Sequence, residues 1–152
     1  MTLIAFHKQL KTITRFTRLV DSKTFKETGS GKVLITHPSE SEVLFQEKGL
    51  WHASQLNFTN TFRWTFDLEA DRVSLEHLRL GAGQPVFLFS LSPQTDRLLI
   101  PDSPHLCNKD CYLLTVTHDP FNIELNWSIA GPKKDEKIFC RYTSSLLTNT
   151  PC

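Results

Sequence analysis

The sequence predicts a mainly β protein: a single antiparallel barrel of about nine short strands behind one leading N-terminal helix. Short alternating segments recur at regular intervals with turn residues between them, and no helical period survives after Gly29. Eleven phenylalanines and three tryptophans add side chains that favour strands. At 152 residues the chain is expected to be one domain over 1–152, with the helix in 1–20 and the barrel in 29–144.

The predicted helix opens the chain. Leu3, Phe6, Leu10, Ile13 and Phe16 recur at spacings of three and four, which gives one buried stripe. Threonines in its later turns weaken it, because β-branched side chains lose rotamer freedom in a helix. Its basic residues are expected to form a solvated face: Lys8, Lys11, Arg15 and Arg18.

Nine strands follow, and each is bounded by proline, glycine or a charged turn. Within 58–68, Phe62, Trp64, Phe66 and Leu68 share one face, while the residues between them are polar. The residues 121–129 alternate without a fault, as a half-buried strand requires. The predicted strands are 31–37, 42–51, 58–68, 72–80, 85–91, 97–100, 110–117, 122–130 and 137–144.

Charge and hydropathy exclude several classes of protein. Seventeen basic against sixteen acidic residues leave a net charge of +1, whereas a nucleic-acid binder normally carries a basic patch, so no nucleic-acid partner is expected. The sequence has neither the ~20 apolar residues of a membrane span nor a signal-peptide pattern. The protein is therefore expected to be cytoplasmic with no membrane partner, and a homodimer is allowed.

The four cysteines lie in the last third of the chain, at positions 107, 111, 140 and 152. Without a secretory signal they are expected to be free thiols, and Cys152 to be frayed. The spacing from His105 to Cys107 and Cys111 matches no standard zinc site. Cys111 and its neighbour Tyr112 also point to opposite faces of a strand, so we expect no metal.

The segment 104–112 has the densest group of reactive side chains, placed where a barrel strand begins. His105, Asp110 and Tyr112 are interpreted as a polar cluster at the rim of a pocket. A Cys107 nucleophile with His105 as its base is a competing hypothesis, but the sequence has no recognisable oxyanion-hole element. The plainest alternative is a structural loop whose aspartate caps backbone amides.

Other charged groups fall within strands or at a hairpin tip. Arg63, His77, Arg79 and Arg141 lie in predicted strands, and any that face the interior need an ion-pair partner or a ligand. Lys133, in the charged run after Gly131 and Pro132, could attract a ligand carboxylate or phosphate at the rim. It could equally be part of a solvated turn.

Several of these segments together resemble an uncharacterised family of small bacterial and fungal proteins, classed as a domain of unknown function. The resemblance covers roughly residues 10 to 143. It rests on Gly29 and Gly31, Phe62-Arg63-Trp64, the spacing His105-x-Cys107-x-x-Asp110-x-Tyr112, Trp127, Gly131-Pro132-Lys133-Lys134-Asp135 and Arg141-Tyr142. It implies a calycin-like barrel, similar to lipocalins, fatty-acid-binding proteins and nitrobindins, and it implies no activity.

The leading functional hypothesis is a barrel that binds a small, largely apolar or amphipathic ligand, with an anionic or haem-like ligand among the candidates. An internal cavity of roughly 300 Å³ or more is expected. The predicted wall comprises Phe62, Trp64, Phe66 and Trp127, and the predicted polar contacts are Arg63, His77, His105, Asp110, Tyr112, Lys133 and Arg141.

The cofactor stays unknown in this hypothesis, and a haem would take His105 or His77 as its axial ligand. Two alternatives remain open. One is an enzyme that uses His105, Asp110 and Tyr112 for acid–base chemistry, although no catalytic residue is assigned. The other is an interaction module that uses the leading helix or a barrel face and has no pocket.

Overall fold

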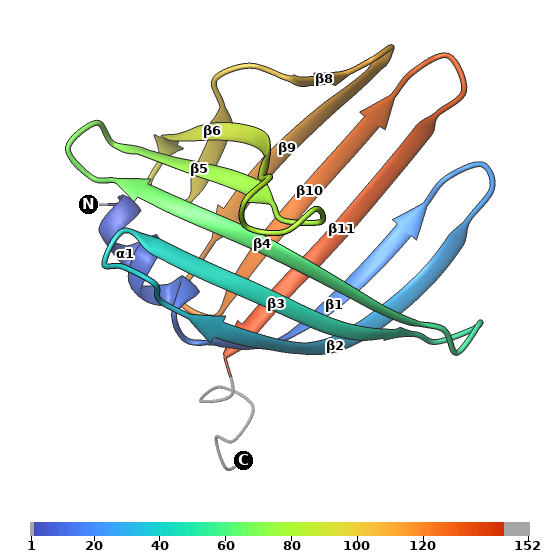
Figure 1. Ribbon diagram of the computed structural model, residues 1–152, viewed down its shortest axis with the longest axis horizontal. Helices are drawn as coiled ribbons and strands as arrows, with labels where there is room; N and C mark the ends of the chain where they lie inside the picture. The colour runs from blue at the N-terminus through green and yellow to red at the C-terminus, as the bar shows by residue number, and fades with distance from the viewer. Residues whose placement is uncertain (1, 145–152) are drawn as a thin grey trace.

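The computed structural model describes residues 2–144, in which one helix and eleven strands occur (Figure 1). No helix within these residues is long and apolar enough to span a membrane. The elements are α1 (Thr2–Leu10), β1 (Ile13–Asp21), β2 (Lys26–Thr36), β3 (Glu42–Trp51), β4 (Asn57–Asp67), β5 (Arg72–His77), β6 (Val86–Thr95), β7 (Leu98–Pro101), β8 (His105–Cys107), β9 (Asp110–His118), β10 (Asn122–Ala130) and β11 (Asp135–Ser144).

The strands form a closed antiparallel barrel, as the sequence predicts. Ten strands complete the ring in the order β10, β11, β1 to β7 and β9, with β9 pairing back to β10. The short β8 lies outside this ring and pairs only with the start of β9. Closure occurs where the first and last strands meet, from Ile13 opposite Ser144 to Asp21 opposite Lys137. The prediction of about nine strands missed β1 and β8.

The predicted leading helix over 1–20 is wrong beyond Leu10, because the chain enters β1 at Ile13. A β-bulge between Ile13 and Arg15 adds one residue to the strand. Ile13 and Phe16 therefore both face the core although they are three positions apart, a spacing that resembles a helical period. After the bulge Phe16 and Val20 continue the inward face with ordinary strand alternation.

Helix α1 closes one end of the barrel, at the left of Figure 1. Leu3, Phe6 and Leu10 are fully buried on one stripe of the helix. The Phe6 ring packs edge-on against Trp64 with the ring centroids 5.6 Å apart, and lies 5.2 Å from the ring of His118. The space beneath α1 is therefore a packed apolar core, and an internal cavity has to lie towards the opposite end.

Candidate functional site

A cavity of about 440 Å³ occupies the end of the barrel opposite α1. Its volume agrees with the expectation of several hundred cubic ångströms. The wall is rich in aromatic rings: Trp51 stacks on Phe58 at 4.4 Å between centroids, and Phe62 stacks on His77 at 4.7 Å. The lining residues are Arg18, Val20, Phe25, Trp51, Phe58, Asn60, Phe62, His77, Leu88, Tyr112, Trp127, Ile129, Glu136, Ile138 and Tyr142.

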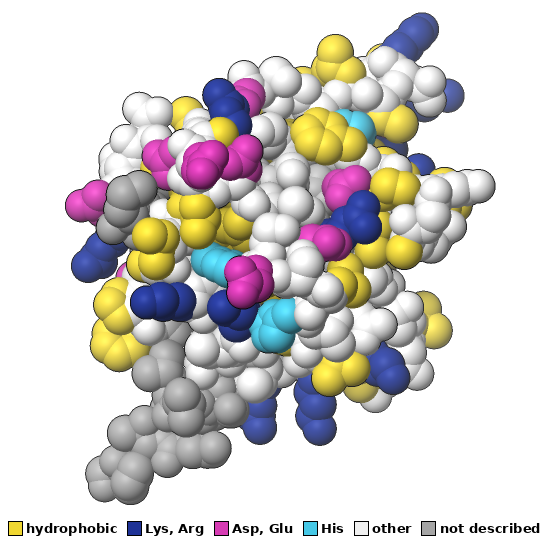
Figure 2. All heavy atoms as spheres, turned by 60° about the vertical axis from the view of Figure 1, so that its left-hand side comes forward, with side chains coloured by type: hydrophobic (Ala, Val, Ile, Leu, Met, Phe, Trp, Pro, Cys, Tyr) yellow, Lys and Arg dark blue, Asp and Glu magenta, His cyan; other side chains and the backbone are white. Residues whose placement is uncertain are grey.

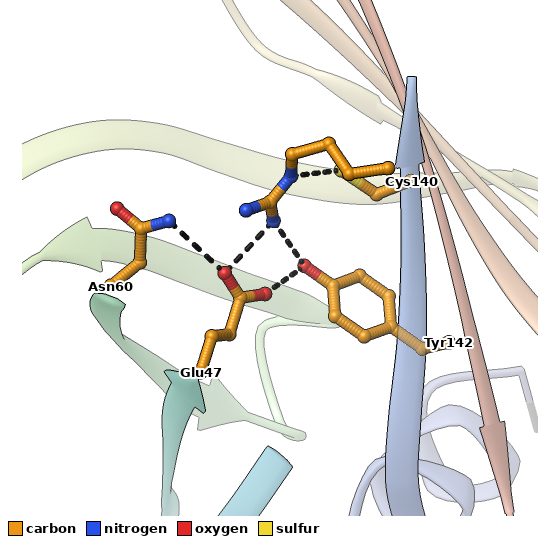
Figure 3. Close-up of polar contacts among 5 residues, drawn as sticks. Glu47, Asn60, Cys140 and Tyr142 are labelled. Atoms are coloured by element: carbon orange, nitrogen blue, oxygen red, sulfur yellow. Dashed lines mark hydrogen bonds and ion pairs between the residues drawn. The ribbon is translucent and has the colours of Figure 1, made fainter. Parts of the chain in front are cut away.

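A buried polar network lies where the cavity meets the core (Figure 3). Arg18 Nη2 contacts Glu47 Oε1 at 2.8 Å and donates a longer bond of 3.4 Å to the hydroxyl of Tyr142. Arg18 Nε donates to Cys140 Sγ at 3.0 Å. Glu47 also accepts from the Tyr142 hydroxyl at 2.5 Å and from Asn60 Nδ2 at 3.3 Å. Five side chains from four strands thus converge on one charge pair.

Burial and the neighbouring groups together determine the protonation states of Arg18, Cys140 and Tyr142. Glu47 is 1% exposed and Arg18 is 8% exposed. Burial opposes the charge of Arg18, but Tyr142, Cys140 and Glu47 together raise the pKa of its guanidinium. Burial also raises the pKa of the Tyr142 phenol and that of the Cys140 thiol. Tyr142 and Cys140 are therefore neutral near pH 7, and Arg18 is the cation that balances Glu47.

Aromatic rings hold the guanidinium of Arg18 in place. Its central carbon lies 4.9 Å from the centroid of the Phe16 ring and 5.5 Å from that of Phe58. Both distances are within the range of cation–π attraction. The position follows from β1, in which Phe16, Arg18 and Val20 alternate inward once the bulge has set the register. The prediction of a solvated Arg18 on a helix is therefore wrong.

Among the predicted site residues, His77, Tyr112 and Trp127 line the cavity. Burial, with a contribution from Arg79, lowers the pKa of His77, so its imidazole is neutral near pH 7. His105 is not among the lining residues, and its ring lies 5.6 Å from that of Tyr112. Of the two candidate haem ligands, only His77 faces the cavity.

Several predicted residues do not line the cavity. Phe66 of the predicted wall is one of them, because it is buried in the core. Trp64 points inward but lies deeper, 2% exposed in the core that fills the α1 end. Arg63 follows Phe62 on β4 and so faces outward, where its Nε contacts Glu76 at 2.8 Å. Arg141 likewise lies outside and pairs with Glu124 on β10 at 3.1 Å.

The segment 104–112 forms the β8–β9 hairpin beside the rim. Asp110 pairs with Lys134 at 3.4 Å, and its carboxylate lies against Gly131, where a side chain would collide with it. Lys133, the predicted rim cation, is exposed. Within residues 2–144 no hydrogen bond joins Asp110 to His105. The predicted cluster is thus divided between a hairpin contact and the cavity wall.

The described cysteines, Cys107, Cys111 and Cys140, are free thiols, and Cys152 lies outside the described residues. In the described part of the chain, no group of three or more histidine, cysteine or acidic side chains could hold a metal ion. Cys107 is exposed on β8, and Cys140 is buried against Arg18.

The predicted site did not include four residues of the cavity and its polar network: Arg18, Glu47, Asn60 and Tyr142. The inward direction of Glu47 was predictable, because Glu47 alternates with Val43 and Phe45 and so shares their inward face. The inward direction of Arg18 was not predicted, because the bulge gives the start of β1 a spacing that resembles a helix.

A second hollow, of about 610 Å³, lies against α1 outside the barrel. Charged and polar side chains bound it, including Lys8, Gln9, Arg97 and Asp119. Figure 2 turns this end of the molecule towards the viewer and shows histidines at the surface between basic and acidic side chains. The cavity inside the barrel, with its aromatic wall and buried ion pair, is the stronger candidate for a ligand site.

Residues 10–144 match the model of DUF6314, a family of unknown function. The chain belongs to this family. No curated protein sequence matches it.

Solved structures include similar barrels. The structure of CPES, an S-type phycobiliprotein lyase from Guillardia theta, superimposes with a TM-score of 0.68 at 8% identity, over 95% of this chain and 93% of that one. A redesigned β-barrel, mFAP1, bound to DFHBI gives 0.46 at 10% identity, covering 87% and 94%. The likeness to CPES establishes a shared fold.

Proposed function

We propose that this protein binds a small ligand with a largely apolar body inside the barrel. The observation that carries the proposal is the cavity of about 440 Å³, with stacked aromatic rings on its wall and a buried ion pair at its inner end. Its volume falls in the range of roughly 300 to 1,000 Å³ that small-molecule sites occupy. A buried polar group at one end of an apolar site orients a ligand, which suits an amphipathic molecule.

The likeness to CPES is compatible with the proposal of a ligand inside the barrel. That protein is a phycobiliprotein lyase, so a barrel of this fold occurs in a lyase that acts on phycobiliproteins. The family description assigns no ligand. The proposal for this chain therefore rests on its own cavity, and the likeness adds only that the fold accommodates such a role.

Filling the cavity tests the proposal. Ile138 lines it from β11, and Ile138→Trp should place an indole in the ligand's space. We expect the neutral fluorescent probe N-phenyl-1-naphthylamine to bind the unaltered protein with enhanced emission. We expect the variant to bind it at least about tenfold more weakly, a loss of about 1.4 kcal/mol.

Leu34→Trp is the matched control, because Leu34 is 62% exposed on β2 and its replacement leaves the interior unchanged. Circular dichroism should show the same strand content in all three proteins. Equal probe binding by the unaltered protein and by both variants would contradict the proposal, as would a lack of binding by the unaltered protein.

A further inference from the structure

One nitrogen of the Arg18 guanidinium, Nη1, makes no hydrogen bond to the described part of the protein. Its Nε donates to Cys140, and its Nη2 donates to Glu47 and to Tyr142. Within residues 2–144, Nη1 has no hydrogen-bond partner. Because Arg18 lines the cavity and guanidinium nitrogens only donate, Nη1 offers two donors at the inner end of the ligand space. A donor that opens on the cavity and has no protein partner favours a ligand that supplies an acceptor.

The carboxylate of Glu47 decides the charge of that acceptor. Its oxygens already accept from Arg18, Tyr142 and Asn60, and it is 1% exposed. The positive charge of Arg18 is therefore matched by a carboxylate 2.8 Å away. A ligand carboxylate at Nη1 would bring a second negative charge into this buried space with no further cation in the network, which is unfavourable.

We propose that the buried end of the ligand is an uncharged carbonyl group, of the ketone, aldehyde, ester or amide class, that accepts from Arg18 Nη1. This inference rests on the proposed function. The sequence allowed a ligand with an anionic end; the inference is that this end is a neutral acceptor instead. The carbonyl accepts from one of the two free N–H groups of Nη1 and leaves the Arg18–Glu47 pair electrically balanced.

Displacement of N-phenyl-1-naphthylamine by two matched probes tests the inference on the unaltered protein. Decanamide and decanoate have the same chain length, and at about pH 8 the acid is fully ionised. We expect decanamide to displace the dye at a concentration at least about tenfold lower than decanoate does. Equal potency, or a preference for decanoate, would overturn the inference.

Glu47→Gln provides a second test in which the preference should move in a known direction. The variant removes the negative charge, so Arg18 gains an uncompensated charge that decanoate can neutralise. The ratio of decanamide to decanoate affinity should fall by at least about tenfold. Glu124→Gln removes an equal charge from the outer surface, where Glu124 pairs with Arg141, and should leave the ratio unchanged.

The two proposals fail in different ways. If the dye does not bind the unaltered protein, the proposed function is wrong. If the dye binds but neither probe is preferred, the cavity binds ligands and only the carbonyl inference is wrong. Should Glu47→Gln not fold, as judged by circular dichroism, the comparison of the two probes on the unaltered protein still decides the inference.

Discussion

The hydroxyl of Tyr142 has two roles at the inner end of the cavity. It donates to Glu47 and accepts a longer bond from Arg18, so it joins both members of a buried ion pair. Buried charges are tolerated only when their hydrogen-bonding capacity is met. The phenol hydroxyl therefore keeps both buried charges hydrogen-bonded, in addition to the apolar contacts of its ring.

Tyr142→Phe should accordingly destabilise the fold while leaving the packing of the ring intact. We expect the free energy of unfolding in urea to fall by about 1–3 kcal/mol, because Glu47 loses a donor while it stays buried. Tyr112→Phe is the matched control, since Tyr112 is only half-buried at the cavity wall. A loss as large in the control as in Tyr142→Phe would contradict the role assigned to the Tyr142 hydroxyl.

Individual side chains were predictable from the sequence where strand alternation was regular. His77, Tyr112 and Trp127 were singled out and line the cavity. Arg18 was not predictable in the same way, because its direction depends on a bulge that only the pairing of β1 with β11 reveals. The ion pair it forms with Glu47 joins residues on separate strands, and no local pattern encodes such a meeting.

At the scale of elements, β2 and β3 approach one another closely where two glycines face each other. Gly31 is paired with Gly49 in the ladder, and a methyl group on Gly31 would collide with the backbone of Lys48 and Gly49. A backbone collision cannot be relieved by rotating a side chain. The small residues are therefore required where these two strands cross the wall beside Phe16 and Phe58.

Gly31→Ala should destabilise the barrel by about 1–3 kcal/mol, the usual cost of overpacking. The free energy of unfolding in urea measures the effect. Gly83→Ala is the control, because a methyl group there meets no atom within 4 Å. A Gly31→Ala variant as stable as the Gly83→Ala control would show that the strands can separate without cost.

The strands were predicted best where polar and apolar residues alternate evenly. The predicted segments 42–51 and 122–130 agree with β3 and β10. The prediction failed at β1, where the bulge imitates a helical spacing, and at β8, whose three residues are too few to show a period. It also began β2 five residues late, because the glycines near its middle suggested a turn.

For the molecule as a whole, the α1 end packs two histidines where the helix meets the barrel: His7 lies on α1 against Phe66, and His118 lies against Phe6. Burial, aided by Lys11 for His7 and by Arg97 for His118, lowers the pKa of both imidazoles. Their Nε2 atoms are buried and have no hydrogen-bond partner within residues 2–144. Protonation would put positive charge at the contact between the helix and the barrel that it closes.

Stability should therefore depend on pH. Because the folded-state pKa values lie below the ordinary value of about 6.5, the unfolded chain binds more protons as pH falls through that value. The free energy of unfolding should be highest above about pH 6.5 and should fall as the pH drops below about 6.5. Urea unfolding at several pH values measures this slope.

His118→Gln cannot take up the proton and should make the slope shallower. His52→Gln, at an exposed position in the β3–β4 turn, should leave it unchanged. If the free energy of unfolding has the same pH dependence in both variants and the unaltered protein, the assignment of this dependence to His118 at the α1 end is wrong.

The pairing of β1 with β11 has a consequence for how the chain folds. These strands come from opposite ends of the described chain, and the ring is open until they meet. Contacts between residues so distant in sequence make folding slow, since the entropy of a long loop is lost before the contacts form. During synthesis, Arg18 would leave the ribosome long before Tyr142 and Cys140 do. The guanidinium therefore stays in water until the last strand arrives, and the ligand site forms only at the end of folding.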